Sequence, residues 1–285
     1  MGGGTYSISN SFARAVTNNY AEKSNAEIFT QRNINNAMNP FGIKVRESRD
    51  SVEHPNSLAV IFGLDVTGSM GSVPHFLVKE GLTKVMGSII QGNEPDPQVL
   101  FLGVGDHECD QSPLQVGQFE SSDELLDKWL TTVYLEGGGG GNAGESYLLA
   151  WYFAAYHTSI DCFEKRGRKG LLFTIGDEPN LKTLPKAFVK KMMGDGQYED
   201  YTAAKLLEKA RERYDVYHIH VAQTGAGSRS ETVDGWKQLM GENLLVAPKS
   251  EDIAGLIVKA VLKGKNVTTL STEAVKPTEN EEILL

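Results

Sequence analysis

The stretch LAVIFGLDVTGSMG, residues 58–71, decides the fold of this 285-residue chain. Its run 58–66 is short, apolar and rich in β-branched side chains, which is typical of a strand buried on both faces of a parallel sheet. The glycines of the following turn relieve its steric cost, and Pro74 is suited to open a helix. Apolar residues then recur at helical spacing from Val78 to Ile90. The stretch therefore predicts a buried strand, a polar turn and a helix.

The same alternation of strand and helix continues along the chain. Buried strands are predicted at 99–105, 170–178, 215–223 and 243–248, and an antiparallel edge strand at 113–119. Helices are predicted from a capping box of Ser121 and Glu124, at 145–159, 183–193 and 201–213, and after caps at Ser230 and Ser250. We therefore expect an α/β fold whose doubly wound, mainly parallel sheet has one antiparallel edge strand and helices on both faces.

Three segments of the chain differ in composition. Residues 1–56 are rich in Asn, Ser and charge, and their scattered apolar residues predict a helix from 11 to about 37 that stops at Asn39-Pro40. We interpret this segment as an N-terminal arm packed on the main domain, which covers 57–264. Residues 265–285 are acidic and lack periodicity, so we expect a C-terminal tail.

The net charge and the lengths of the apolar stretches argue against nucleic acid and membranes as partners. A net charge of −9 argues against a duplex-binding protein, and the longest apolar stretch, 147–156, is about half of what a bilayer requires. The first residues lack the cationic and apolar regions of a secretory signal, and two cysteines do not make a disulfide framework in a chain this long. We expect a cytoplasmic protein that binds neither nucleic acid nor a membrane.

Oxygen-bearing side chains gather after the predicted strands and in the glycine-rich turn at 137–146. Because the carboxyl ends of parallel strands meet at one edge of a sheet, we expect these side chains to lie close together. Carboxylate and hydroxyl oxygens suit Mg²⁺, with Mn²⁺ or Ca²⁺ as alternatives. The candidate ligands are Asp65, Thr67, Ser69, Asp106, Glu108, Asp110, Asn142, Glu145, Ser146, Asp177 and Glu178.

The run LDVTGSMG, residues 64–71, resembles the metal-ion-dependent adhesion site of von Willebrand factor A domains, which that family writes as D-x-S-x-S. The predicted order of elements is similar to that domain across about 57–264. The resemblance implies that Thr67 and Ser69 bind Mg²⁺ through their hydroxyls. It implies that Asp65 acts mainly through bound water and that Asp177 is the later aspartate of the site. One coordination position would then be left for a carboxylate of a protein partner.

The second loop of the site departs from the family's pattern. Von Willebrand factor A domains offer a threonine after a Gly-Gly turn, whereas this register places Asn142, so Glu145 or Ser146 could serve instead. The runs HPNSLAVIFGLDVTGSMG and LEGGGGGNAGESY also resemble stand-alone bacterial and phage proteins of this class. The ligand set that the resemblance implies is Asp65, Thr67, Ser69, Asn142 and Asp177.

Two functions follow as hypotheses. In the first, the chain is not an enzyme but a binding module, an adaptor in a multiprotein assembly, in which Mg²⁺ captures an Asp or Glu side chain of a protein partner. By analogy within bacterial proteins of this class, a MoxR-type AAA+ ATPase fits that partner. In the alternative, the chain is a phosphoesterase-like, metal-dependent hydrolase in which Asp106, Glu108 and Glu178 add a second ion or a general base. The two hypotheses differ in whether Asp106 or Glu178 reaches the first ion.

Overall fold

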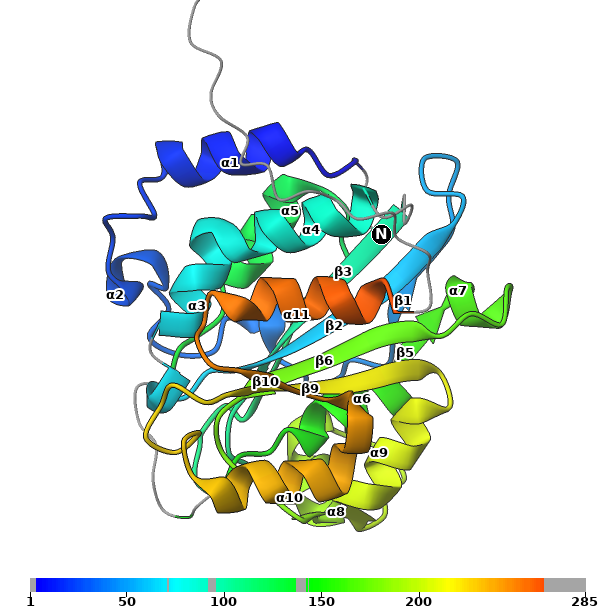
Figure 1. Cartoon of the computed structure of the whole chain (residues 1–285). Coiled ribbons are helices and arrows are strands. Elements are labelled where there is room, and N and C mark those ends of the chain that lie inside the picture. The colour runs from blue at the N-terminus through cyan, green and yellow to red at the C-terminus, as the bar shows by residue number, and fades with distance from the viewer. Residues whose placement is uncertain (1–3, 71, 92–95, 137–141, 143, 264–285) are drawn as a thin grey trace, which may run out of the picture.

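A six-stranded sheet forms the centre of the protein (Figure 1). The computed structural model of the chain describes residues 4–70, 72–91, 96–136, 142 and 144–263. Along the sheet the strands follow the order β10-β9-β6-β2-β3-β4, and every neighbouring pair is parallel except β3 with β4. The predicted fold class is therefore confirmed, including its antiparallel edge strand. The strands are β2 (Ser57–Asp65), β3 (Asp96–Val104), β4 (Leu114–Val116), β6 (Gly170–Gly176), β9 (Tyr214–Val221) and β10 (Leu244–Ala247).

The central strands are buried along their whole length, as their apolar sequences predict. Every residue of β2, β3 and β6 is buried. The parallel register pairs Asp65 with Val104 and Leu64 with Ile175, so the three strands end at the same edge of the sheet. The loops that follow β2, β3 and β6 therefore start side by side.

Helices cover both faces of the sheet, and the two faces have separate cores (Figure 1). On one face lie α4 (Leu82–Gln91), α5 (Asp123–Thr131) and α11 (Asp252–Val261), against side chains such as Phe62 of β2. On the other face lie α6 (Leu148–Tyr156), α8 (Lys186–Met193), α9 (Ala203–Arg211) and α10 (Ser230–Met240), against side chains such as Ile61. Alternate residues of β2 thus feed opposite cores. No helix of the described residues has the length and apolar character that crossing a bilayer requires.

The turn after β2 leads into one long helical segment. A short η2 (Gly68–Met70) precedes α3 (Ser72–Phe76), which continues through the π-helical η3 (Leu77–Gly81) into α4. The predicted start of this helix at Pro74 is two residues late, because the helix already begins at Ser72. Proline fits the first turn of a helix, where its missing N–H removes no intrahelical hydrogen bond.

The N-terminal arm does not form the single long helix that its apolar spacing predicts. It consists of α1 (Ile8–Thr17), α2 (Asn25–Ile28), η1 (Asn36–Met38) and β1 (Arg46–Ser48). The chain leaves the helical path at Asn19, whose φ is 54°, and a capping box of Ser24 with Glu27 starts the next helix. Phe29 and Met38 of the arm are buried in the core that also contains α4.

Several local predictions are wrong by a few residues. Ser122 rather than Ser121 caps α5, because the Ser122 hydroxyl accepts the backbone N–H of Leu125. The helix predicted from 145 begins instead at Leu148, since the backbone at Glu145 forms a β-bridge with Asn180. Ser230 and Ser250 are the predicted caps of the last two helices. The residues at the capping positions of α10 and α11 are instead their neighbours, Arg229 and Glu251.

The structure also contains two pairs of short strands outside the central sheet, which the sequence pattern does not predict. The arm's β1 pairs in parallel with β5 (Thr158–Ile160), which precedes α7 (Asp161–Glu164). An antiparallel pair, β7 (Thr183–Leu184) with β8 (Tyr201–Thr202), brackets α8. These segments are two or three residues long, too short for a pattern of alternation to identify them.

His218 on β9 gives a first testable prediction. Its ring is fully buried and stacks on Trp236 with the centroids 3.4 Å apart, beside Tyr147, while Nδ1 bonds the Thr174 hydroxyl at 2.9 Å. Burial, and secondarily His220, lowers the pKa of His218 well below its ordinary value of 6.5. As the pH falls through 6.5, the unfolded chain binds a proton on this histidine and the folded state does not. The free energy of unfolding therefore decreases as the pH falls.

We expect His218→Phe to reduce the slope of the free energy of unfolding against pH by up to about 1.4 kcal/mol per pH unit, because one titrating group is removed. Urea unfolding at pH 7, 6 and 5 measures it. Equal slopes in the native and variant proteins would show that the proton uptake lies elsewhere.

Candidate metal-binding site

Asp65 is the last residue of β2 and the centre of the site. Only 1 % of the residue is exposed. Its Oδ1 accepts hydrogen bonds from the backbone N–H of Thr67 at 2.9 Å and from the Thr67 hydroxyl at 2.6 Å, and its Oδ2 accepts one from the Tyr147 hydroxyl at 2.7 Å. Burial raises the pKa of Asp65, these hydrogen bonds lower it, and the charge of Asp177 raises it further. Both carboxylate oxygens are thus fixed in position, in surroundings that disfavour negative charge.

Tyr147 reaches Asp65 because β6 ends in a glycine. A Cβ atom at Gly176 would overlap the hydroxyl and ring of Tyr147. The same hydroxyl lies 3.4 Å from the backbone nitrogen of Glu178, the donor of a long hydrogen bond. The absence of a side chain at Gly176 therefore lets one tyrosine connect the ends of β2 and β6. Sequence reasoning missed Tyr147, because an aromatic residue at the start of an apolar helix is typical of core.

Asp177 follows β6 directly and is fully buried. The register that pairs Leu64 with Ile175 places the ends of β2 and β6 side by side, and the charge of Asp177 raises the pKa of Asp65. Thr67 is also buried, at 6 % exposed. The structure thus brings together Asp65, Thr67 and Asp177, as the sequence predicts from the carboxyl ends of parallel strands.

The second loop offers three oxygen-bearing residues, and they differ in what they contact. Asn142 is exposed, and its side-chain amide donates to Glu108 Oε2 at 2.8 Å. The Ser146 hydroxyl is buried and engaged by His107, accepting its backbone N–H at 2.9 Å and lying 2.7 Å from Nδ1. Glu145 is buried, and its Oε2 has no hydrogen-bond partner among the described residues.

The side chain of Ser69 and the glycine run at 137–141 lie outside the described residues. The backbone of Ser69 belongs to η2, directly after Thr67 and Gly68. Within the described part of the chain, no three His, Cys, Asp or Glu side chains already converge as a set that would hold a metal alone. A ligand set at this edge therefore has to include hydroxyl or amide oxygens.

The loop after β3 uses its carboxylates to hold its own backbone. Asp106 Oδ1 accepts the backbone N–H of Glu108 at 2.8 Å, and Asp110 Oδ2 accepts that of Asp106 at 2.7 Å. Both carboxylates still act electrostatically on Glu145. The second ion that the hydrolase hypothesis would place near Asp106 stays a hypothesis.

The edge has a surplus of negative charge that fits a hard divalent cation. Burial, followed by the charges of Asp65, Asp110, Asp106 and Glu178, raises the pKa of Glu145. None of these groups is a cation. An orphaned carboxylate oxygen together with buried carboxylates of raised pKa is what a site for Mg²⁺, Mn²⁺ or Ca²⁺ presents before the ion binds.

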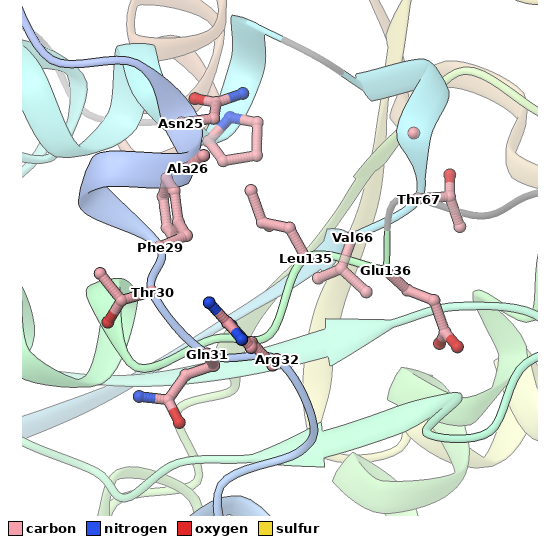
Figure 2. A pocket seen from close by; sticks show the side chains of 12 residues that line it. Asn25, Ala26, Phe29, Thr30, Gln31, Arg32, Val66, Thr67, Leu135 and Glu136 are labelled. Carbon is pink, nitrogen blue, oxygen red and sulfur yellow. The ribbon is translucent and has the colours of Figure 1, made fainter.

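A pocket of about 600 Å³ adjoins the site (Figure 2). One wall comes from the arm and the other from the turn after β2 and from the segment around Glu136, whose backbone forms a β-bridge with that of Thr67. Figure 2 shows the guanidinium of the exposed Arg32 extending from the arm into this space. No motif in the sequence indicates that Arg32 lines this pocket. The lining residues include Asn25, Phe29, Arg32, Val66, Thr67 and Glu136.

No family model and no curated protein matches the chain. Its fold is similar to that of the pilus adhesin SpaC from Lactobacillus rhamnosus GG, with 11 % identity over 76 % of this chain and a TM-score of 0.48. The chain spans 31 % of that adhesin's length. An aerotolerance-related membrane protein from Bacteroides fragilis gives 13 % identity over 72 % of this chain and 99 % of its own, with a TM-score of 0.42.

Proximal thread matrix protein 1 from the mussel byssus gives 10 % identity over 76 % of this chain and 49 % of its own, with a TM-score of 0.44. Likenesses at this level say nothing about what the chain binds. The strand order and the contacts at the sheet edge are therefore the basis for function.

Proposed function

We propose that the chain is a binding module of the von Willebrand factor A type, in which a divalent cation at the carboxyl edge of the sheet captures a carboxylate of a protein partner. One observation supports it above the others. Asp65, Thr67 and Asp177 meet at one edge, in the order that the D-x-T-x-S run and the later aspartate predict. In this proposal the ligands are Asp65, Thr67, Ser69, Asn142 and Asp177, and the ion is Mg²⁺.

The residues around the ion have separate roles. The Thr67 hydroxyl, now donated to Asp65, would turn its lone pairs to the ion. Tyr147 would keep Asp65 in place through Oδ2. Mg²⁺ would supply an electrophilic position for an incoming carboxylate, because it reverses the negative potential of the edge. Asp106, one of the carboxylates that the hydrolase hypothesis needs, uses Oδ1 to hold the backbone of its own loop, which supports binding over hydrolysis at that residue. Glu178, the other carboxylate named for that hypothesis, keeps a buried Oε2 with no hydrogen-bond partner among the described residues, so hydrolysis stays the alternative.

The pocket beside Thr67 suits a partner segment that carries acidic residues. Arg32 is an exposed cation that forms no ion pair within the described residues, and it lies next to the proposed point of capture. A partner that presents Asp or Glu to the ion would offer a neighbouring acidic or carbonyl oxygen to Arg32. We propose a cytoplasmic adaptor of bacterial or phage origin, with a MoxR-type AAA+ ATPase as one such partner.

Calorimetric titration with Mn²⁺ and Mg²⁺ tests the proposed function. We expect saturable binding with a stoichiometry of about one ion to the native chain, and loss of that binding in Asp65→Ala. Glu120→Gln is the matched control, because Glu120 is also a buried carboxylate but bridges to Val99 in the first half of β3, away from the end of the strand where the site lies. Equal binding by the native chain and Asp65→Ala, or none by either, would contradict the ligand set.

A further inference from the structure

Glu145 combines burial with a carboxylate oxygen that has no hydrogen-bond partner among the described residues. Only 7 % of the residue is exposed, and its Oε2 accepts no hydrogen bond from a described residue. The backbone around it is held in place, since its N–H donates to Pro179 at 2.8 Å and its carbonyl accepts from Leu181 at 2.9 Å. A buried carboxylate in this condition needs either a proton or a cation.

The surroundings of Glu145 point to a cation. The charges that raise the pKa of Glu145 most are those of carboxylates, and that of Asp65, the central residue of the site, comes first among them. The other residues of the second loop differ from Glu145, because Asn142 is exposed with its side-chain nitrogen donating to Glu108, and the Ser146 hydroxyl bonds His107. Glu145 is therefore the residue of this loop that presents a buried carboxylate oxygen without a hydrogen-bond partner among the described residues.

We propose that Glu145 is a resident ligand of the cation at this site, and that a partner's carboxylate has to displace it. The inference rests on the proposed function. No three acidic side chains of the described residues already converge, so the proposal requires the Glu145 side chain to rotate toward the ion when the ion enters. Together with Asp65 and Asp177 it gives three negative charges against two positive ones, so the loaded site has a net charge of −1. A further carboxylate is then repelled unless Glu145 leaves.

The partner class follows from this charge balance. A lone carboxylate cannot compete with one that is tethered at high effective concentration. The partner therefore has to offset the displacement with further contacts, and the pocket with Arg32 provides a place for them. The metal-loaded site without a partner therefore binds free carboxylates, such as acetate or amino acids, more weakly than it binds a protein surface.

Water-proton relaxation by bound Mn²⁺ tests the proposal, because relaxivity rises with the number of water molecules on the ion. We expect Glu145→Gln to weaken Mn²⁺ binding by about tenfold or more and to raise the relaxivity of the bound ion by the contribution of one further water. We expect added acetate to lower that relaxivity in Glu145→Gln but not in the native protein. Glu145→Asp, which keeps the charge on a shorter side chain, should fall between the two.

Glu120→Gln is again the matched control, since Glu120 is also 7 % exposed with an unpartnered Oε2 but lies away from this edge. It should bind Mn²⁺ with native affinity and relaxivity. Native values in both Glu145→Gln and Glu145→Asp would overturn the role of Glu145 while leaving metal binding intact. No binding of Mn²⁺ to the native chain would overturn the proposed function itself, which separates the two failures.

Discussion

Gly176→Ala is expected to destabilise the protein by about 3 kcal/mol or more. The new methyl group would overlap the hydroxyl and ring of Tyr147, so the side chain or the end of β6 has to move. Such overpacking costs about 1–3 kcal/mol. The movement also breaks the hydrogen bond from Tyr147 to Asp65 Oδ2 and leaves a buried acceptor unsatisfied, at a further cost of about 1–3 kcal/mol.

Urea unfolding of the native chain and the variant measures this loss. Gly235→Ala is the matched control, because a Cβ there meets no atom within 4 Å and the residue lies inside α10. Alanine at an open helical position should raise stability by about 0.5–1 kcal/mol. A Gly176→Ala variant as stable as the native chain would show that Tyr147 is free to move and does not fix Asp65.

Raising the pH above neutrality is expected to destabilise the metal-free protein, and Mg²⁺ is expected to remove that effect. Burial raises the pKa of both Asp65 and Glu145 above their ordinary values of 3.8 and 4.5. The folded state therefore retains protons that the unfolded state has already released. Stability is fully present below pH 4 and is lost as pH rises through the raised folded pKa values.

Across the window from pH 7 to 9 the response to Mg²⁺ separates these carboxylates from Cys109 and Cys162, whose raised pKa also makes the folded state retain protons as the pH approaches 9. Buried histidines such as His218, whose pKa is lowered, are neutral in both states there and do not contribute. Loss of one retained proton corresponds to about 1.4 kcal/mol per pH unit, so we expect a fall of about 2 kcal/mol across the window in the presence of a chelator. Chemical denaturation at pH 7, 8 and 9 measures it.

Mg²⁺ should flatten this dependence, because it stabilises the charged carboxylates and so replaces the protons. Glu145→Gln should reduce the slope without any metal, since it removes one of the two groups. Stability that stays constant or rises from pH 7 to 9 in chelator would show that neither carboxylate retains a proton in the folded state.

The central sheet was predictable because its signal is long and local. The apolar runs 58–66 and 99–105 predict strands buried on both faces, and the carboxyl ends of parallel strands must share an edge. That geometry alone brings Asp65 and Asp177 together. The arm was not predictable in the same way, because a single residue, Asn19, breaks the helix by taking a left-handed backbone conformation.

The finer contacts of the site depend on tertiary packing, which leaves no pattern in the sequence. Tyr147 reads as the start of an apolar helix, yet its hydroxyl crosses to Asp65 because Gly176 leaves room. Among the oxygens of the second loop, spacing favours Asn142, whereas burial without a hydrogen-bond partner among the described residues distinguishes Glu145. Which side chain points inward is decided by backbone bonds to Pro179 and Leu181, more than 30 residues further along the chain.

The position of β2 in the sheet sets the order in which the chain can assemble during synthesis. β2 pairs with β3 about 40 residues later, but its other neighbour, β6, begins only at Gly170. Pairings so distant in sequence form late, because a long loop has to close first. During synthesis, Asp65 is therefore made long before Tyr147, which donates a hydrogen bond to it, and before Asp177, whose charge acts on it. The proposed metal site at the carboxyl edge of the sheet is therefore complete only after the second half of the chain has left the ribosome and packed against the first half.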